Sequence, residues 1–277
     1  LPLSGALLKL DGVLGFAGWR WLYFAEGVPA VLMGFVVLRY LPDSPPEARW
    51  LSTEQREWLS KTIADESAHA PSGHVGGWRR AFSDYKVWLL SLFWLSQAFG
   101  TIGVTLFLPQ ILKGLSGASN FIVSLLSALP FLLACVLMYL NSRHSDATQE
   151  RRFHLGIPLL ISGVLLAISI ATGNLTVTYL MLVAAVGLNW AVTPVFWAVT
   201  TQYLAGGAAA AGAIALINAV ANIAGVGLPP VMGYIKDQTG TYNYGLLLVA
   251  SVLIFGGLLG LVLARKCAPT PTAPTEP

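Results

Sequence analysis

Two asparagines stand in a stretch of sequence that carries no charge. Asn218 and Asn222 lie in AIALINAVANIAGVGLPPVMGYIKD, which has no charged residue between Ala213 and Lys236. A spacing of four residues places both amides on one face of a helix, and Gly225 follows on the same face. A carboxamide both donates and accepts hydrogen bonds. The pattern therefore predicts either a bond between packed helices or a contact with a polar solute.

Neutral polar residues form two further stripes of this kind. One stripe repeats every four residues and consists of Gln97, Thr101 and Thr105. The other consists of Asn189, Thr193 and Thr200, and it shares a helix face with Phe196 and Trp197. One interpretation is bonding between helices, worth about 0.6 kcal/mol for each such bond. The other is a wet cavity that offers neutral donors to a polar solute. The candidate cavity residues are Asn222, Asn218, Gln97, Thr101, Asn189 and Thr193, with Thr105 and Thr200 continuing the stripes.

Enzyme chemistry finds little support in the sequence. There is no phosphate-binding loop that ends in Lys-Ser/Thr, no HExxH and no GxSxG. His69 and His74 lack helical spacing and a third ligand, which indicates a loop pair and no metal site. Cys135 and Cys267 are too differently placed to form a disulfide. We expect no enzyme activity, no cofactor and no metal.

The elements that must position the polar stripes are membrane-spanning helices. Of the 277 residues, 55% are hydrophobic and only 10% are charged, whereas soluble domains carry roughly 25% charged residues. The apolar runs approach the ~20 residues that a helix needs to cross a bilayer. The predicted spans are Trp21–Leu41, Val87–Leu112, Phe121–Leu140, Leu155–Ala171, Thr176–Thr200, Gly212–Tyr234 and Tyr244–Ala264. Prolines inside or near the ends of these spans predict bent or broken helices; they are Pro109, Pro130, Pro158, Pro194, Pro229 and Pro230.

The distribution of lysine and arginine predicts the orientation. One side of the membrane collects Arg49, Arg56, Lys61, Arg79, Arg80, Lys86, Arg143, Arg151, Arg152, Arg265 and Lys266, and the other only Lys9, Arg20, Lys113 and Lys236. The positive-inside rule makes the first side cytoplasmic, in a plasma (inner) membrane. The net charge of +3 then reflects topology, and we expect no nucleic-acid partner.

The charge and hydropathy pattern also predicts the organisation of the chain. Residues 1–41 hold the end of one span and a complete span, 42–86 form a cytoplasmic loop, 87–264 form a six-helix bundle, and 265–277 form a disordered cytoplasmic tail. Within the loop, Ser52 and Gln55 predict a capping box at the start of an amphipathic helix. Trp58, Leu59 and Ile63 form its apolar stripe. Because the chain begins at Leu1 within an apolar run, we expect that preceding helices are absent.

Four segments resemble one transporter family in the same order. They are GWRWLYFAEGVPAVLMGFVVLRYLPDSPPEARWLSTEQREWL, FLPQILK, SDATQERRFH and AAAAGAIALINAVANIAGVGLPPVMGYIKDQTGTY. They are similar to the anion–cation symporter family of the major facilitator superfamily, which includes tartrate- and phthalate-type carriers. The resemblance implies an all-α membrane protein with the major facilitator fold: part of helix five, helix six and the carboxy-terminal six-helix bundle of a twelve-helix carrier.

The resemblance also implies roles for individual residues. Asn222 resembles in position a substrate-contacting asparagine of helix eleven; Asn218 comes second, and Gln97 resembles a cavity position only loosely. Asp146, Arg151 and Arg152 resemble an acid–base latch between helices eight and nine. Two positions depart from the family pattern, since Ala147 stands in place of an arginine and Gln149 in place of a glycine. The latch is therefore expected to be weaker, and its charges also suit simple topology markers.

These observations predict a secondary carrier for a small organic anion. The expected substrate is a tartrate-like hydroxy- or dicarboxylate, moved with protons by alternating access. An aromatic carboxylate or a sugar acid is the alternative substrate, and a non-transporting scaffold or receptor-like half-protein is the alternative function. The spans from Val87 onward contain no Asp, Glu, Lys, Arg or His, so the cation and the proton site are expected in an absent amino-terminal bundle. The chain alone is expected to be inactive, with that bundle and the lipid bilayer as its partners.

Overall fold

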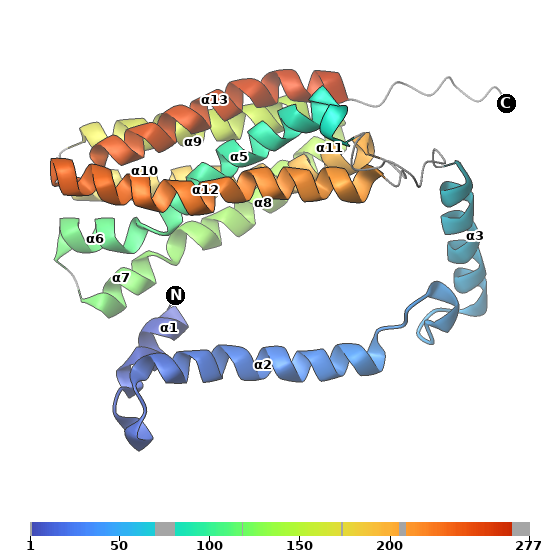
Figure 1. Cartoon of the computed structure of the whole chain (residues 1–277), viewed down its shortest axis with the longest axis horizontal. Coiled ribbons are helices and arrows are strands. Elements are labelled where there is room, and N and C mark those ends of the chain that lie inside the picture. Colours follow the sequence, from blue (N-terminus) through green and yellow to red (C-terminus); the bar gives the residue numbers. More distant parts are fainter. Residues whose placement is uncertain (1, 70–80, 118, 173, 205–208, 268–277) are drawn as a thin grey trace. The chain divides into compact units, whose positions relative to one another are not determined.

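The computed structural model describes residues 2–69, 81–117, 119–172, 174–204 and 209–267 (Figure 1). All regular elements in these ranges are helices. The chain divides into two compact units, Leu1–Pro71 and Ser72–Pro277. The predicted loop histidine His74 and most of the predicted tail lie outside the described residues.

The first unit contains one long apolar helix and one short polar helix. Its elements are α1 (Pro2–Leu7), η1 (Leu8–Leu10), η2 (Val13–Gly15), α2 (Gly18–Tyr40), η3 (Pro45–Glu47) and α3 (Thr53–His69). The start of α2 is fixed because the Gly18 N–H donates to Asp11 Oδ1 at 2.6 Å. Gly18 also lies against Leu8, whose carbonyl oxygen would be 2.7 Å from an added Cβ.

The predicted capping box is present at the start of α3. The Ser52 N–H donates to Gln55 Oε1 at 3.0 Å, and the Gln55 N–H donates to Ser52 Oγ at 3.2 Å. These reciprocal bonds satisfy two backbone donors that a helix start leaves without partners. The start of this helix was therefore readable from the sequence. Trp58 and Ile63 of its apolar stripe are both exposed within the chain.

The second unit is a bundle of helices built from six spans. Its elements are α5 (Tyr85–Thr105), α6 (Leu108–Ser116), α7 (Asn120–Leu126), α8 (Leu129–Thr148), α9 (Arg152–Ala171), α10 (Leu175–Ala191), α11 (Thr193–Tyr203), α12 (Ala209–Thr239) and α13 (Asn243–Cys267). The extensive pairings are α13 with α9 and α5, α12 with α5, and α10 with α8 and α9. Leu90, Phe93, Leu155 and Phe196 are fully buried between these helices.

Three of the six spans are broken, each one just before a proline. Pro109, Pro130 and Pro194 stand in the first turn of α6, α8 and α11. A proline fits there because the first turn of a helix does not use its own N–H groups, whereas the preceding residue is disfavoured in the helical conformation. By contrast, Pro158 lies inside the continuous helix α9, and Pro229 and Pro230 lie inside α12. The break at Val192 lies near the middle of its span, Leu175–Tyr203, whereas the breaks before α6 and α8 lie closer to one end of theirs.

Among the residues that the structure describes, seven helices are long and apolar enough to cross a membrane, as predicted. They are Gly18–Tyr40, Tyr85–Gly114, Phe121–Thr148, Arg152–Ala171, Leu175–Tyr203, Ala210–Thr239 and Asn243–Leu263. Several of these helices run past the apolar segment that predicted them, and α13 continues to Cys267. Backbone hydrogen bonds extend into the polar flanks, where hydropathy gives no signal.

Glycines allow α9 and α13 to approach each other closely. The two helices lie side by side in Figure 1. A Cβ added at Gly257 would be 2.6 Å from the backbone nitrogen of Leu160, and one added at Gly163 would be 2.8 Å from the carbonyl oxygen of Ala250. Close approach through small residues is a usual way to pack helices in a bilayer, where hydrophobic driving force between helices is weak.

We therefore predict that Gly257→Ala destabilises the bundle. The added methyl group meets backbone atoms that cannot move away, which costs about 1–3 kcal/mol. The melting temperature of the purified protein in detergent should fall. Gly227→Ala in α12 is the matched control, because no atom lies within 4 Å of its Cβ position. A Gly257→Ala melting temperature equal to that of Gly227→Ala would contradict the close packing of α9 and α13.

Candidate functional site

Three of the candidate residues form one buried hydrogen-bonded cluster between α5 and α10. Gln97 Nε2 and Asn189 Nδ2 both donate to Thr101 Oγ1, at 3.1 Å and 3.0 Å. Gln97 Nε2 also lies 3.5 Å from the carbonyl oxygen of Asn189. Gln97 is 3% exposed and Asn189 is 2% exposed. These groups bond mainly to one another. This arrangement agrees with the interpretation that the polar stripes form hydrogen bonds between helices.

The cluster leaves some polar atoms without a partner. A Cβ at Gly100 would be 2.5 Å from Asn189 Oδ1, so only glycine lets this amide lie against α5. Asn189 Oδ1 and Thr193 Oγ1 are buried and form no hydrogen bond with a described residue. A buried polar atom without a partner costs about 1–3 kcal/mol. The α10–α11 stripe thus keeps hydrogen-bonding capacity that the bundle does not use.

Asn218 belongs to a separate group that joins α12 to aromatic rings. Trp94 Nε1 donates to Asn218 Oδ1 at 3.4 Å, while Asn218 Nδ2 donates to the carbonyl oxygen of Ile214 at 3.0 Å. The Trp94 ring stacks on Phe196 with centroids 4.6 Å apart, and Trp197 meets Trp94 edge-on at 5.3 Å. The sequence pointed to Phe196 and Trp197, but not to Trp94, because the contact joins residues 124 positions apart.

Asn222 has a different environment from the other candidates. Its side chain is exposed within the chain, between Ala221 and Ala224, which are buried. It forms no hydrogen bond with a residue that the structure describes. It also lies near the middle of the 31-residue helix α12. This amide is therefore presented at mid-span with its donors and acceptor available.

The candidate residues lie at a similar depth in the bundle. The break between α10 and α11 is at Val192, beside Asn189 and Thr193, near the middle of the span Leu175–Tyr203. Hydrogen bonds connect this point to Gln97 and Thr101 near the middle of the span Tyr85–Gly114. The structure thus places the amides and hydroxyls of Gln97, Thr101 and Asn189 together at mid-span, with no ionisable side chain among them.

The residues of the predicted latch lie where α8 ends and α9 begins. Arg151 Nη1 lies 2.5 Å from Asp146 Oδ1 and also donates to Ser145 Oγ at 2.9 Å. Arg152 instead donates through Nε to the carbonyl oxygen of Leu261 on α13 at 2.6 Å. Gln149, which replaces the expected glycine, adopts a left-handed conformation with φ 54°. The ion pair therefore involves Arg151, while Arg152 ties α9 to α13.

A second polar group beside the latch was not predicted from the sequence. His154 Nδ1 donates to Glu150 Oε2 at 2.8 Å, and His154 Nε2 lies 2.7 Å from His144 Nδ1. Burial acts to raise the pKa of the Glu150 carboxyl, but hydrogen bonds from the N–H groups of Phe153 and Arg152 and from His154 outweigh it and lower the pKa. The four-residue spacing between Glu150, just before α9, and His154 on α9 was the available signal. The sequence does not show that His144 on α8 lies beside His154 on α9, because that contact depends on how the two helices pack.

Comparison with known proteins identifies the type of protein. A family model described as Major Facilitator Superfamily matches residues 2–227. Two proteins of Agrobacterium vitis, each named "Putative tartrate transporter", are 38% identical to the chain over 95% and 96% of its length. A protein of Acinetobacter baumannii named "Quinolone resistance transporter" is 33% identical over 96% of the chain. These relatives are named as transporters, which agrees with the expectation of no enzyme.

A solved structure shares the fold. The crystal structure of a bacterial homologue of the human lysosomal transporter Spinster matches 98% of this chain and 69% of its own, with a TM-score of 0.66 and 18% identity. The chain spans about 60% of the length of the curated relatives described above, since it covers 60%, 58% and 61% of them.

We predict that Asn189→Ala lowers the stability of the bundle. The change removes a donor to Thr101 and leaves a cavity beside Gly100, which should cost about 1–3 kcal/mol. Thermal unfolding of the purified protein in detergent measures this loss. Asn222→Ala is the control, because this amide is exposed and has no partner among the described residues. Equal melting temperatures for both variants would show that the buried cluster does not hold α5 and α10 together.

The Glu150 carboxylate gives a prediction on pH. Because its folded pKa lies below the ordinary value of 4.5, its contribution to stability is complete above about pH 4.5 and is lost as the pH falls through the folded value. The melting temperature of Glu150→Gln should lie below that of the unchanged protein at pH 7, and the difference should shrink toward pH 3. Glu57→Gln, on the exposed surface of α3, is the control. A difference that does not change with pH would contradict this assignment.

Proposed function

The chain belongs to the Major Facilitator Superfamily, and we propose that it forms part of a secondary transporter that moves a small organic anion by alternating access. The observation that carries this proposal is the set of neutral amides and hydroxyls near mid-span, on α5, α10, α11 and α12. Transporters of this general kind bind their substrates near the bilayer midplane, between two helical bundles. Asn222 is the member of this group that is exposed and lacks a partner among the described residues.

We propose that Asn222 and Asn218 contact the substrate. Hydroxyl and carboxylate oxygens of a tartrate-like acid would accept hydrogen bonds from the Asn222 amide. Asn218 accepts a hydrogen bond from Trp94, so the indole ring would form one wall of the site and restrict the shape of the substrate. Gln97, Thr101, Asn189 and Thr193 would complete the site from behind, where Asn189 Oδ1 and Thr193 Oγ1 have hydrogen-bonding capacity left. The similarity to two proteins named as tartrate transporters supports this substrate class.

The substrate charge and the coupling to protons need groups that these spans do not contain. No Asp, Glu, Lys, Arg or His lies within the six predicted spans from Val87 to Ala264. Transferring a carboxylate out of water costs several kcal/mol unless a cation compensates it, and a proton needs an ionisable side chain to carry it. We propose that an amino-terminal helical bundle supplies both groups, so that symport requires the two bundles together.

The proposed orientation places the loop between α2 and α5 and the carboxy-terminus in the cytoplasm, in a plasma (inner) membrane. Lysine and arginine asymmetry between the two sides supports it. Asp146, Arg151 and Arg152 then lie at the cytoplasmic end of the bundle. We propose that the Asp146–Arg151 ion pair and the bond from Arg152 to α13 hold α8, α9 and α13 together in one conformation of the transport cycle.

An aromatic carboxylate is a second candidate substrate. The stacked rings of Trp94 and Phe196, with Trp197 edge-on, would suit a flat ring at the same depth as Asn222. Stacking contributes about 0.5–1.5 kcal/mol beyond burial of the ring. Competition between tartrate and benzoate for uptake separates the two substrate classes.

Uptake of radiolabelled tartrate into proteoliposomes tests the proposed function. We expect none with residues 1–277 alone, and proton-driven uptake when the amino-terminal part of an Agrobacterium vitis relative is added as a second chain. In that system Asn222→Ala should raise KM about tenfold or more, because a hydrogen bond to a charged group is worth about 1.5–3 kcal/mol. Melting temperature should stay unchanged.

The matched control is Ile223→Ala, which alters the neighbouring exposed side chain without removing a hydrogen bond. Its KM should stay near that of the unchanged protein. Saturable, proton-driven uptake by residues 1–277 alone would refute the division of roles between two bundles. An unchanged KM in Asn222→Ala would remove this residue from the substrate site.

A further inference from the structure

Three arginines line a single hollow in the first unit, where the span α2 ends. The hollow has a volume of about 1120 Å³ and lies between the end of α2, the turn η3 and the start of α3. Its lining includes Arg39 from the last turn of α2, Arg49 from the linker and Arg56 from α3. The local chain therefore brings three guanidinium groups, separated by up to 17 positions in the sequence, to one place.

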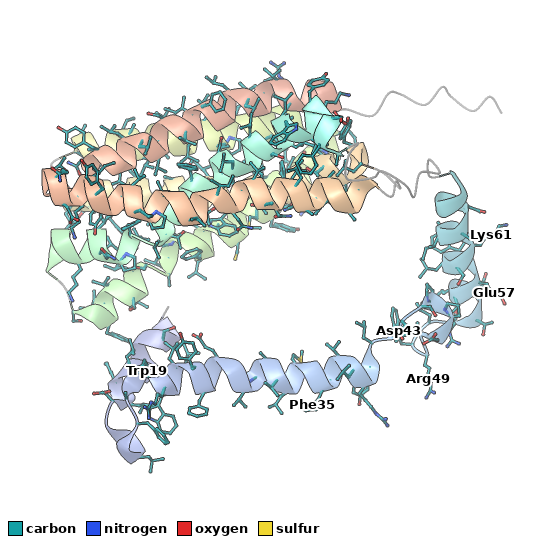
Figure 2. The ribbon with its side chains drawn as sticks, viewed as in Figure 1. Trp19, Phe35, Asp43, Arg49, Glu57 and Lys61 are labelled. Carbon is teal, nitrogen blue, oxygen red and sulfur yellow. The ribbon has the colours of Figure 1, made fainter. Side chains whose placement is uncertain are left out.

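The local fold explains why the three arginines converge. Ser44 Oγ donates to Glu47 Oε1 at 3.0 Å and the Leu51 N–H donates to the carbonyl oxygen of Ala48 at 3.0 Å, so the linker turns back on itself. Ala48 is 2% exposed and anchors this turn. The capping box at Ser52 then fixes the direction in which α3 leaves. Figure 2 shows Arg49 on this linker, with Glu57 and Lys61 along α3.

The side chains that line the hollow carry a net positive charge. None of the three arginines forms an ion pair with a residue that the structure describes. Arg56 Nε is buried and lacks a hydrogen-bond partner among the described residues. Glu47 is the acidic residue in the lining, and Ser44 already binds its carboxylate. Three guanidinium groups with one carboxylate leave a net positive site, and guanidinium geometry matches the oxygens of a phosphate group.

The position of the hollow at the end of the span α2 indicates which kind of phosphate compound it could bind. Arg39 and Tyr40 are the last residues of α2, which is long and apolar enough to cross a membrane, so the hollow should lie where hydrocarbon gives way to headgroups. Tyr40 and Trp50 line it and are 76% and 73% exposed within the chain. Tyrosine and tryptophan favour the membrane–water interface. Arginines used only as topology markers would not need to share one hollow with these rings.

We propose that this hollow binds the phosphate of an anionic phospholipid. Arg39, Arg49 and Arg56 hold the phosphate oxygens, while Tyr40 and Trp50 lie against the glycerol and the upper acyl chains. Inorganic phosphate presents the same oxygen chemistry but has no acyl chains for the aromatic rings. The site joins the end of α2 to the start of α3 through a lipid, and it does not depend on which solute the protein transports.

Native mass spectrometry of the purified 277-residue protein, released from neutral detergent micelles doped with phosphatidylglycerol or phosphatidylcholine, tests the proposal. We expect retention of phosphatidylglycerol in preference to phosphatidylcholine. Arg49→Gln should lower the affinity for phosphatidylglycerol about fivefold. This factor corresponds to about 1 kcal/mol, the contribution of one basic residue near an anionic surface. The triple variant Arg39→Gln, Arg49→Gln, Arg56→Gln should lose the preference.

The matched control is Arg20→Gln, which removes the same charge near the other end of α2, outside the hollow. It should keep the preference for phosphatidylglycerol, and Arg49→Lys should keep most of it. Unchanged retention in Arg49→Gln and the triple variant, or an equal loss in Arg20→Gln, would overturn the proposal. Binding of 10 mM inorganic phosphate that displaces phosphatidylglycerol completely would also overturn it, because the ligand would then be soluble phosphate.

Discussion

The hydrocarbon core of a bilayer has no water to bond with polar groups, and the structure of the bundle depends on this constraint. A polar group inside a span must find its partner within the protein. Ser91 and Ser96 accordingly donate to carbonyl oxygens one turn earlier on α5, and Ser162 donates across to the carbonyl oxygen of Ala185 on α10. Ion pairs in the described residues lie at helix ends. Burial of polar groups, as much as apolar packing, thus determines which helix faces meet.

The exceptions to this constraint are informative about function. Asn189 Oδ1 and Thr193 Oγ1 are buried without partners among the described residues, and Asn222 presents a complete amide at mid-span. A carrier has to exchange hydrogen bonds with a moving solute, so its site must keep donors and acceptors that the folded protein has not already paired. A bundle that satisfied every amide internally would be more stable and less able to bind. The unpaired groups of Asn189, Thr193 and Asn222 therefore support the proposal of a site that a substrate completes.

The sequence predicted the elements well and the environments of their side chains poorly. Apolar runs located seven spans, Ser52 and Gln55 located a helix start, and Pro109, Pro130 and Pro194 marked the breaks, because each of these signals is local. Gln97 and Asn222 give the same local signal, an amide in an apolar helix with small or hydroxyl neighbours at helical spacing. One is buried against α10 and the other is exposed, since that difference depends on which helix packs opposite. The bond from Arg152 to Leu261 spans 109 positions and has no signature in either segment.

The separation of charge from the middle of the bundle also bears on how such a protein could change conformation. Charged groups such as Asp146, Arg151 and Glu150 lie at the junction of α8 and α9, where water can replace a broken ion pair at a cost of about 0–1 kcal/mol. The mid-span groups cannot be rehydrated so cheaply unless the bundle opens to water or a solute. Bonds at the ends can therefore form and break as helices move, whereas bonds at the centre require an exchange of partners. In the proposed transport cycle, the helix ends would therefore set the balance between conformations, and the mid-span amides would respond to the bound solute.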